Sequence, residues 1–328
     1  MPWQISAVIP VRNNAEDLPA AVQSLLTQAP LTHGVLSEIV LCVGPSDDAS
    51  LEVAEALASD HTIVDVVVNA HGGIPQALNL GLRHITGDVL LRLDAHSILP
   101  TNYAANALET MEATGASNVG AVQNPVGQTM AERAIAAAMG GRAGSGGADY
   151  RHGGGTPRKV ETAFLGFFST EAVRGIGGWD EAFSRNEDAE LNARLINAGH
   201  EVWLDPRLVV DYRPRPTLRA LAKQYFRYGP GRLQTIRKHP ETLKARQLAA
   251  PLIVVGLVTG VGLALLATPW FWVVPGAYVA GVLAAGLASG GPLRQRLVTG
   301  AALATMHVSW GSGFLLAAMR SLVQRGST

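Results

Sequence analysis

Residues 88–96 read Asp-Val-Leu-Leu-Arg-Leu-Asp-Ala-His, an apolar run that ends on a carboxylate and an imidazole. A run of this length and composition favours a buried β-strand. Asp94 and His96 follow that strand two residues apart, where both side chains could bind one divalent cation. The triplet is also common by chance, and an Asp after a strand often caps a helix. Both interpretations remain open on these residues alone.

Similar strand-like runs occur three more times, separated by segments with apolar residues at helical spacing. The predicted strands are residues 4–9, 38–43, 62–68 and 88–94, and the predicted helices are residues 15–28, 50–59 and 74–84. This alternation predicts an α/β fold with a mostly parallel sheet and helices on both faces. Ligands of such sheets bind at the carboxyl ends of the strands. The polar turns at those ends are residues 10–14, 44–48 and 94–96.

The composition divides the chain into two parts. Of the 328 residues, 48% are hydrophobic and only 16% are charged, which excludes a disordered protein and a nucleic-acid binder with basic tails. Residues 1–212 carry 25 acidic and 12 basic side chains, whereas residues 213–328 carry 1 acidic and 14 basic. Cys42, the single cysteine, excludes a disulfide within the chain and a cysteine zinc cluster. No secretory signal is visible, so we expect the first part to face the cytosol.

The last third contains three uncharged runs, residues 248–268, 270–290 and 298–319. A helix of about 20 residues spans a hydrocarbon core of roughly 30 Å, so we expect three transmembrane helices. Arg294 and Arg296 lie between the second and third runs, and the positive-inside rule places that loop in the cytosol with residues 1–247. The alternative is a set of buried helices in a soluble domain, which three consecutive uncharged runs disfavour.

Residues 213–246 hold 10 of the 26 basic side chains and a single acidic one. Apolar residues recur among them at helical spacing, which is typical of an amphipathic helix on an anionic membrane surface. Some of these arginines could instead bind phosphate groups of a substrate, and both uses can hold for different residues. We therefore predict a catalytic domain over 1–212, a membrane-interface segment over 213–247 and a transmembrane region over 248–328.

The segment 140–155 is rich in glycine. Such a composition buries too little surface to order itself, so we expect no regular structure there. The segment is either a surface linker or a mobile lid beside a site, since long loops inside compact domains are often functional.

Glu187 and Asp188 stand at the start of a segment with helical spacing. Adjacent carboxylates at a helix N-terminus are favoured by the helix dipole, which is a purely structural explanation. The functional alternative makes one of them a general base within reach of an acceptor hydroxyl. The residues alone favour neither explanation.

Six motifs occur together in an order typical of one enzyme family. They are residues 8–13 (Val-Ile-Pro-Val-Arg-Asn), 73–81 (Gly-Ile-Pro-Gln-Ala-Leu-Asn-Leu-Gly), 91–96 (Leu-Arg-Leu-Asp-Ala-His), 177–181 (Gly-Gly-Trp-Asp-Glu), 186–191 (Asn-Glu-Asp-Ala-Glu-Leu) and 224–229 (Gln-Tyr-Phe-Arg-Tyr-Gly). Through these motifs, residues 5–240 resemble a family 2 glycosyltransferase of the GT-A fold, close to the bacterial succinoglycan-biosynthesis type. The resemblance implies a Rossmann-like, mostly parallel catalytic domain.

The resemblance also implies roles for the acidic residues. Asp94 and His96 occupy the family's Asp-x-Asp motif, which holds the diphosphate of a nucleotide sugar through a divalent cation, Mn²⁺ or Mg²⁺. Histidine in the last place matches this subgroup, and it is an accepted metal ligand. Asp188 occupies the general-base position, and Glu187 precedes it in the same motif.

Further positions of the motifs imply a pocket for the nucleotide. Pro10, Val11 and Arg12 would line the base and ribose. The family's second strand usually ends on an Asp that contacts uracil, but the residue here is Val43. Asp48 matches a later acid of that motif, and Asp47 is then the carboxylate left to contact the base.

Gln224 and Arg227 match the Gln-x-x-Arg-Trp motif of membrane glycosyltransferases, with Tyr228 in place of Trp, near the diphosphate and the acceptor. The resemblance thus implies inverting transfer of a hexose from a UDP-sugar to a hydroxyl. The apolar runs and the basic stretch 213–246 predict that this acceptor is a polyprenyl-linked saccharide presented at the membrane. The three apolar runs and the positive-inside rule predict a multi-pass protein of the inner membrane with a cytoplasmic catalytic domain. Nucleotide sugar, lipid-linked acceptor and membrane lipids are the expected partners; nucleic acid is not, and a homo-oligomer stays open. The alternatives are a polyprenyl-phosphate sugar synthase and a non-catalytic subunit that binds nucleotide sugar.

Overall fold

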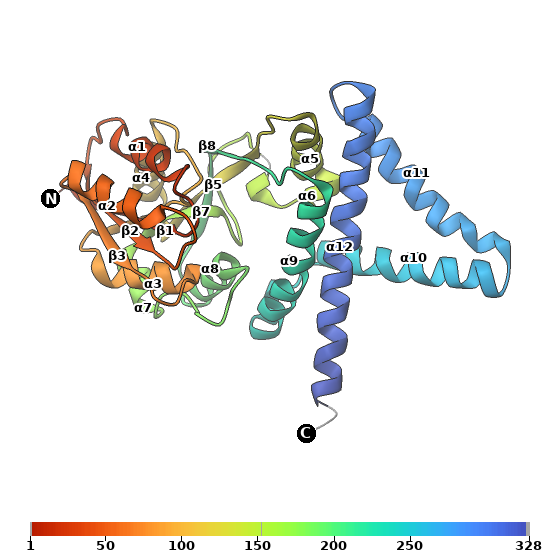
Figure 1. Ribbon diagram of the computed structural model, residues 1–328. Coiled ribbons are helices and arrows are strands. Elements are labelled where there is room, and N and C mark those ends of the chain that lie inside the picture. The colour runs from red at the N-terminus through yellow and green to blue at the C-terminus, as the bar shows by residue number, and fades with distance from the viewer. Residues whose placement is uncertain (1, 152, 326–328) are drawn as a thin grey trace. The chain divides into compact units, whose positions relative to one another are not determined.

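The computed structural model describes residues 2–151 and 153–325 of the chain. The chain divides into two compact units, of which the first comprises Met1–Gln123 and His152–Asp211. An eight-stranded sheet forms the centre of this unit, with the order β3-β2-β1-β4-β7-β5-β8-β6 (Figure 1). The strands are β1 (Trp3–Val11), β2 (Gly34–Val43), β3 (Val64–Val68), β4 (Val89–Arg92), β5 (Asn118–Pro125), β6 (Arg158–Lys159), β7 (Phe164–Ser169) and β8 (Val202–Tyr212).

The first four strands form the parallel part of the sheet. β1 pairs in parallel with both β2 and β4, and β2 pairs in parallel with β3. β7 lies antiparallel to β4 and to β5, so the sheet is mixed. The four strands predicted from the sequence all form, and the predicted α/β architecture is confirmed. The antiparallel strands were not predicted, because their apolar runs are short and lack a regular alternation with helices.

Helices cover both faces of the sheet. The helices are α1 (Leu18–Leu26), α2 (Ser50–Asp60) and α4 (Tyr103–Thr114) on one face, and α3 (Ile74–His84), α7 (Thr170–Gly175) and α8 (Glu187–Asn197) on the other. Alternate residues of β1 bury themselves in the two resulting cores: Ile5 and Ile9 pack on the α1 side, and Val8 packs on the α3 side. Because a parallel strand is covered on both faces, β1 is mostly apolar, and its only polar residues are Gln4 and Ser6.

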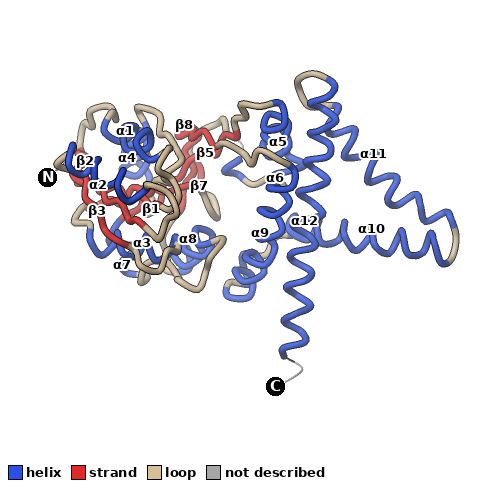
Figure 2. Tube along the Cα trace, viewed as in Figure 1, coloured by secondary structure: helices blue, strands red, loops and turns tan. Residues whose placement is uncertain are grey.

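The second unit comprises Asn124–Arg151 and Tyr212–Thr328, and its described part is almost entirely helical (Figure 2). Its helices are α5 (Met130–Gly140), α6 (Arg142–Ser145), η1 (Asp149–Arg151), α9 (Leu218–Lys238), η2 (Pro240–Thr242), η3 (Ala245–Leu248), α10 (Ala249–Leu266), η4 (Pro269–Trp272), α11 (Val273–Leu287) and α12 (Leu293–Arg325). The domain boundaries predicted at residues 212 and 247 stay predictions.

Three segments of the second unit are long and apolar enough to cross a membrane: Ala245–Leu266, Pro269–Leu287 and Leu293–Val323. They correspond to the three predicted runs. Leu252, Val258 and Leu266 of the first segment are more than half exposed, as expected where lipid rather than protein covers a helix. The prediction of three apolar C-terminal helices is confirmed.

Glycines set how closely α12 approaches its neighbours. A Cβ atom built on Gly313 would lie 2.1 Å from the Phe226 carbonyl oxygen of α9, and one built on Gly229 would lie 2.4 Å from the Phe314 nitrogen. Gly300 meets α11 in the same way, at 2.9 Å from the Val282 carbonyl oxygen. Small residues allow helix backbones to touch in apolar surroundings. The last glycine of the 224–229 motif therefore has a packing role.

The glycine-rich segment has more structure than predicted. It forms α6 and η1, and the helices beside it supply the missing partners. His307 Nε2 of α12 lies 2.9 Å from the Ala143 carbonyl oxygen, and Arg246 Nη1 donates to the Gly147 carbonyl oxygen at 3.3 Å. The prediction of no regular structure is therefore wrong for residues 142–151, because composition alone does not show which neighbours a segment will meet.

Candidate active site

The turns after β1 and β2 are joined by hydrogen bonds. Asn13 adopts a left-handed conformation with φ of 54°, and its amide N–H donates to Ser46 Oγ at 3.1 Å. The Asn13 side-chain oxygen accepts from the Asp47 N–H at 2.7 Å. Arg12 Nη1 reaches across to the Gly72 carbonyl oxygen at 3.4 Å, in the turn after β3. The carboxyl ends of three parallel strands thus form one connected rim, the expected place for a ligand.

The two carboxylates of the second turn have different roles. Asp48 accepts from the Ser50 hydroxyl at 2.5 Å and from the Ala15 N–H at 3.0 Å. These bonds, led by that from Ser50, hold the pKa of Asp48 below its ordinary value. Asp47 uses its backbone in the turn and exposes its side chain. The structure therefore favours Asp47 over Asp48 as the contact to a base.

The β1 residues assigned to the nucleotide pocket also differ from one another. The side chain of Val11 is buried in the sheet core, with 2% exposure, and its carbonyl oxygen accepts from the Gly44 N–H at 2.8 Å. Pro10 is half-buried and Arg12 is exposed. Val11 can therefore shape the pocket only through its backbone, whereas Pro10 and Arg12 can present side chains.

A buried arginine joins the acidic motifs. Arg92, the last residue of β4, is 4% exposed, and its Nη2 lies 3.2 Å from Asp94 Oδ1 and 3.3 Å from Glu187 Oε1. Its Nη1 donates to Asp188 Oδ1. Motifs almost a hundred residues apart in the chain therefore converge on one guanidinium. We call Arg92, Asp94, Glu187 and Asp188 the acidic cluster.

The acidic cluster favours a proton acceptor at Asp188. Burial raises the pKa of Asp188 to about 7; Arg92 opposes the shift, and the carboxylates of Glu187 and Asp94 add to it. A carboxylate that titrates near neutral pH is suited to general-base chemistry. The side chain of Asp188 keeps 24% of its surface exposed, so a substrate hydroxyl has access to it.

The acidic cluster also fits a cation by charge and donor type. Three carboxylates against one guanidinium leave an excess of negative charge. Asp94 offers a carboxylate, and His96 offers an exposed imidazole in the same turn. Among residues 2–151 and 153–325, no group of three or more His, Cys, Asp or Glu side chains is arranged as a complete metal site. Mg²⁺ is often held by only one or two carboxylates together with substrate phosphates, so the lack of a larger ligand group among the described residues is compatible with such an ion.

Two other motifs hold the loop before α8. Asn79 of α3 accepts from the Trp179 N–H at 2.7 Å and donates to the Trp179 carbonyl oxygen at 2.8 Å. Arg194 of α8 forms an ion pair with the fully buried Glu190 at 2.7 Å and donates to the Gly178 carbonyl oxygen at 2.7 Å. Gly178 has a φ of 72°, a conformation that glycine adopts readily. These contacts fix the loop that leads to the first turn of α8, where Asp188 lies.

Gln224 and Arg227 lie on α9, in the second unit. Gln224 Nε2 is 3.1 Å from the Tyr212 hydroxyl and 2.8 Å from the Tyr228 hydroxyl, and Arg227 is exposed. Tyr228, which replaces the family's Trp, is thus a hydrogen-bond partner of Gln224. The roles predicted for Gln224 and Arg227 at the diphosphate and acceptor stay predictions.

Arg92 and Asn79 are the site residues that the sequence analysis missed. Both stood inside quoted motifs without a role. A signal was present for Arg92: a charged residue in an otherwise apolar strand must find a partner, because an unpaired buried charge is costly. No comparable signal marked Asn79, since its partner is backbone a hundred residues away.

Comparison with known proteins identifies the family. The model described as glycosyl transferase family 2 matches residues 6–159, and that described as glycosyl transferase family group 2 matches residues 89–292. The chain is 33% identical over 312 residues to the succinoglycan biosynthesis protein ExoA of Rhizobium meliloti (strain 1021), covering 94% of this chain and 92% of that protein.

Two more distant similarities concern a second relative and a solved structure. A Methanococcus voltae enzyme is 25% identical over 251 residues, covering 71% of this chain and 74% of its own. It is named a dolichyl N-acetyl-alpha-D-glucosaminyl phosphate 3-beta-D-2,3-diacetamido-2,3-dideoxy-beta-D-glucuronosyltransferase. The mannosyltransferase PcManGT from Pyrobaculum calidifontis, solved with GDP-Man and Mn²⁺, aligns with a TM-score of 0.60 at 20% identity, covering 98% of this chain and 88% of its own. That structure supports the fold.

Proposed function

The chain belongs to glycosyltransferase family 2, and we propose that it transfers a hexose from a UDP-sugar to a hydroxyl of a polyprenyl-linked saccharide, with inversion. The family and the GT-A fold are those predicted from the six motifs. One observation carries the proposal: the candidate base Asp188 and the candidate cation ligand Asp94 meet through Arg92.

Asp188 acts as the base in this proposal. It takes the proton from the acceptor hydroxyl as that oxygen attacks the anomeric carbon on the face opposite the leaving diphosphate. One such displacement inverts the configuration and needs no covalent sugar–enzyme intermediate. Arg92 holds the Asp188 carboxylate in place, and burial, with a smaller contribution from Glu187, keeps the pKa of Asp188 high enough to accept a proton.

Asp94 and His96 would hold a divalent cation, Mn²⁺ or Mg²⁺, beside the diphosphate. When bound, the cation supplies positive charge that stabilises the leaving nucleoside diphosphate. Arg227 adds a guanidinium for the same charge, and Gln224 orients the acceptor. Pro10, the Val11 backbone and Arg12 line the base and ribose pocket. Asp47 takes the base contact that Val43 cannot make, since Val43 is an apolar, buried residue.

The acceptor is proposed to be presented at the membrane. Three segments are long and apolar enough to span it, and the basic stretch 213–246 precedes them. Such a stretch is suited to anionic lipid on the cytosolic side, which supports a catalytic unit in the cytosol and a protein of the inner membrane. The name of the Methanococcus relative describes transfer to a lipid-linked sugar, which supports the same acceptor class here.

The test is nucleoside diphosphate release by the full chain in membranes. A panel of sugar nucleotides is assayed with and without Mn²⁺ and with soluble or lipid-linked saccharide acceptors. We expect release with a UDP-sugar, Mn²⁺ and lipid-linked acceptor. Asp188→Asn should reduce it by about 10³-fold. Equal rates on soluble and lipid-linked saccharides would contradict the acceptor assignment.

The same variant separates the main alternative. A polyprenyl-phosphate sugar synthase has an acceptor that is already ionised and needs no strong base, so Asp188→Asn would keep substantial activity on polyprenyl phosphate. A non-catalytic subunit would bind the sugar nucleotide without releasing nucleoside diphosphate under any of these conditions.

A further inference from the structure

A second polar cluster lies in the second unit. It consists of Arg151, Gln224 and four tyrosines, Tyr150, Tyr212, Tyr225 and Tyr228. The Arg151 guanidinium carbon lies 5.4 Å from the centre of the Tyr150 ring. The rings of Tyr225 and Tyr228 lie 5.5 Å apart on α9. We call this set the tyrosine cluster.

Two buried polar atoms of the tyrosine cluster lack partners. Within the described residues, neither Arg151 Nη1 nor Gln224 Oε1 has a hydrogen-bond partner, although both atoms are shielded from solvent. Leaving such an atom unpaired costs the full desolvation penalty of that group. Arg151 Nη1 is therefore a donor, and Gln224 Oε1 an acceptor, that a bound ligand could satisfy.

The charge of Arg151 is also not offset. No ion pair joins Arg151 to a carboxylate in the part of the chain that the structure describes, and its close neighbours are phenols. Burial raises the pKa of Tyr228 to about 12 and that of Tyr225 further, so both are neutral near pH 7. A partly buried guanidinium without a counter-charge is a site for an anion, since guanidinium groups match phosphate oxygens.

The missing groups define the ligand. An anionic oxygen satisfies Arg151 Nη1, and a hydroxyl group satisfies Gln224 Oε1 by donating to it. Tyrosine rings add flat, amphipathic surface of the kind that packs against a partly polar ligand. A sugar attached to phosphate carries all of these features in one molecule.

We propose that the tyrosine cluster binds the phosphate-linked sugar at the head of the lipid-linked acceptor. This rests on the proposed function. The acceptor is favoured over the donor because every residue of the cluster belongs to the unit that carries the three apolar spans. The segment that bears Arg151 is held to α12 through Ala143 and His307.

Direct binding tests the site. The full chain in phosphatidylcholine nanodiscs is titrated with glucose 1-phosphate, glucose and inorganic phosphate by calorimetry. We expect glucose 1-phosphate to bind best, Arg151→Met to weaken it at least tenfold, and Arg151→Lys to weaken it less. Arg142→Met is the matched control, because it removes the same charge from an exposed position nearby. Unchanged affinity in Arg151→Met, or an equal loss in Arg142→Met, would overturn the proposal.

Further arms identify the source of the phosphate. Arg151→Met should raise the KM for lipid-linked acceptor at least tenfold and leave UDP-sugar affinity unchanged. A matching loss of UDP-sugar affinity would assign the cluster to the donor and refute the proposal. The proposal would also be refuted if phosphatidylglycerol nanodiscs weakened glucose 1-phosphate binding and this effect required Arg151. If no sugar is transferred but glucose 1-phosphate binding still depends on Arg151, the proposed function fails while the sugar-phosphate site stands.

Discussion

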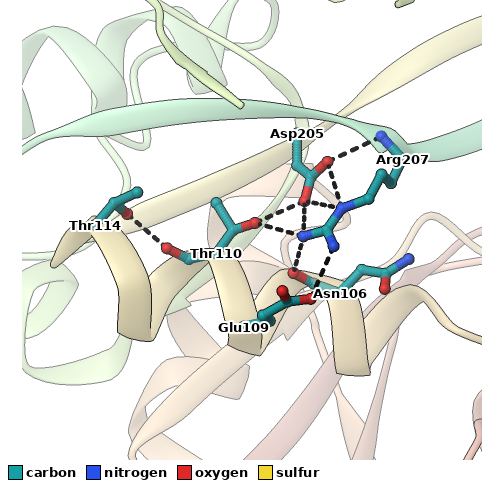
Figure 3. A network of polar contacts seen from close by, with 6 residues as sticks. All are labelled: Asn106, Glu109, Thr110, Thr114, Asp205 and Arg207. Atoms are coloured by element: carbon teal, nitrogen blue, oxygen red, sulfur yellow. Dashed lines mark hydrogen bonds and ion pairs between the residues drawn. The ribbon is translucent and has the colours of Figure 1, made fainter. Parts of the chain in front are cut away.

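Arg92 and Arg207 are two arginines of the first unit with different roles: one belongs to the candidate active site, and the other stabilises the fold. Arg92 contacts the carboxylates of Asp94, Glu187 and Asp188. Arg207 of β8 contacts Asp205 and Glu109, and Figure 3 shows that Thr110 of α4 completes its network. Both arginines join segments that are far apart in the chain.

The difference lies in what the two networks leave unsatisfied. Asp205 is fully buried, and it accepts from Thr110 at 2.6 Å and from Arg207 at 2.8 Å. Burial alone would raise the pKa of Asp205, but these bonds outweigh it and lower that pKa. In the acidic cluster, negative charge is in excess, the carboxylates remain partly exposed and the pKa of Asp188 is raised. A closed network supports the fold, and an open one can bind a ligand.

The largest expected effect is a loss of sugar transfer when Arg92 is removed from the acidic cluster. Arg92→Met removes the contact that holds Asp188, so we expect the rate of sugar transfer to fall about 10²- to 10³-fold, since misplaced catalytic groups cost this much. The free energy of unfolding should fall only by about 1–2 kcal/mol, because the three carboxylates keep access to water. Activity assays and urea unfolding measure the two. Full activity of the Arg92→Met variant would show that Arg92 does not contribute to the active site.

Arg207→Met should give the reverse pattern. It leaves the fully buried Asp205 without its main partner, and breaking a buried ion pair typically costs about 3–5 kcal/mol of unfolding free energy. The partial exposure of Arg207 places the expected loss near the lower end, at about 3 kcal/mol. Sugar transfer at 20 °C by the folded fraction should be unchanged. A large loss of transfer without a loss of stability would contradict the comparison.

The acidic cluster predicts how the activity depends on pH. Asp188 must be unprotonated to act as base, so activity should fall as the pH drops below about 7. The Glu187 carboxylate helps to raise that pKa. Glu187→Gln should therefore lower it and move the acid limb of the kcat/KM profile to lower pH, by roughly half a unit to one unit. Arg207→Met should leave the acid limb of the profile in place. An acid limb that Glu187→Gln does not move would mean that Glu187 does not affect the pKa of Asp188.

Much of the parallel half of the fold and part of the site were predictable from the sequence. Asp94 and His96 follow an apolar run, and the end of a parallel strand is a place where ligands bind whatever the rest of the chain does. The meeting of Asp94 with Asp188 was supplied by the family resemblance, since spacing alone left Glu187 and Asp188 undecided between helix cap and base.

Other features depend on neighbours that no local pattern shows. Asp48 and Asp47 are adjacent and chemically identical, yet only the Asp48 carboxylate holds the turn, because Ser50 and Ala15 donate to it. The glycine-rich segment became ordered because α12 meets it. The network of Asp205 gave no signal either, since its partners on α4 lie about a hundred residues earlier in the sequence.

The smallest expected effect comes from removing the Thr110 hydroxyl from the network of Asp205 and Arg207. Thr110→Val keeps the shape of the side chain but removes the hydroxyl that donates to Asp205 and accepts from Arg207. Asp205 retains Arg207, so the network loses two hydrogen bonds, together worth about 1–2 kcal/mol, rather than a charge. We expect urea unfolding to report that loss, with the kcat/KM profile unchanged at every pH. Thr114→Val is the control on the same helix: its hydroxyl donates to the Thr110 carbonyl oxygen at 2.6 Å and touches neither charge, so its loss should be smaller. Equal losses in the two variants would mean that the Thr110 hydroxyl contributes no more than an ordinary helix bond, and that the closed network rests on the ion pair alone.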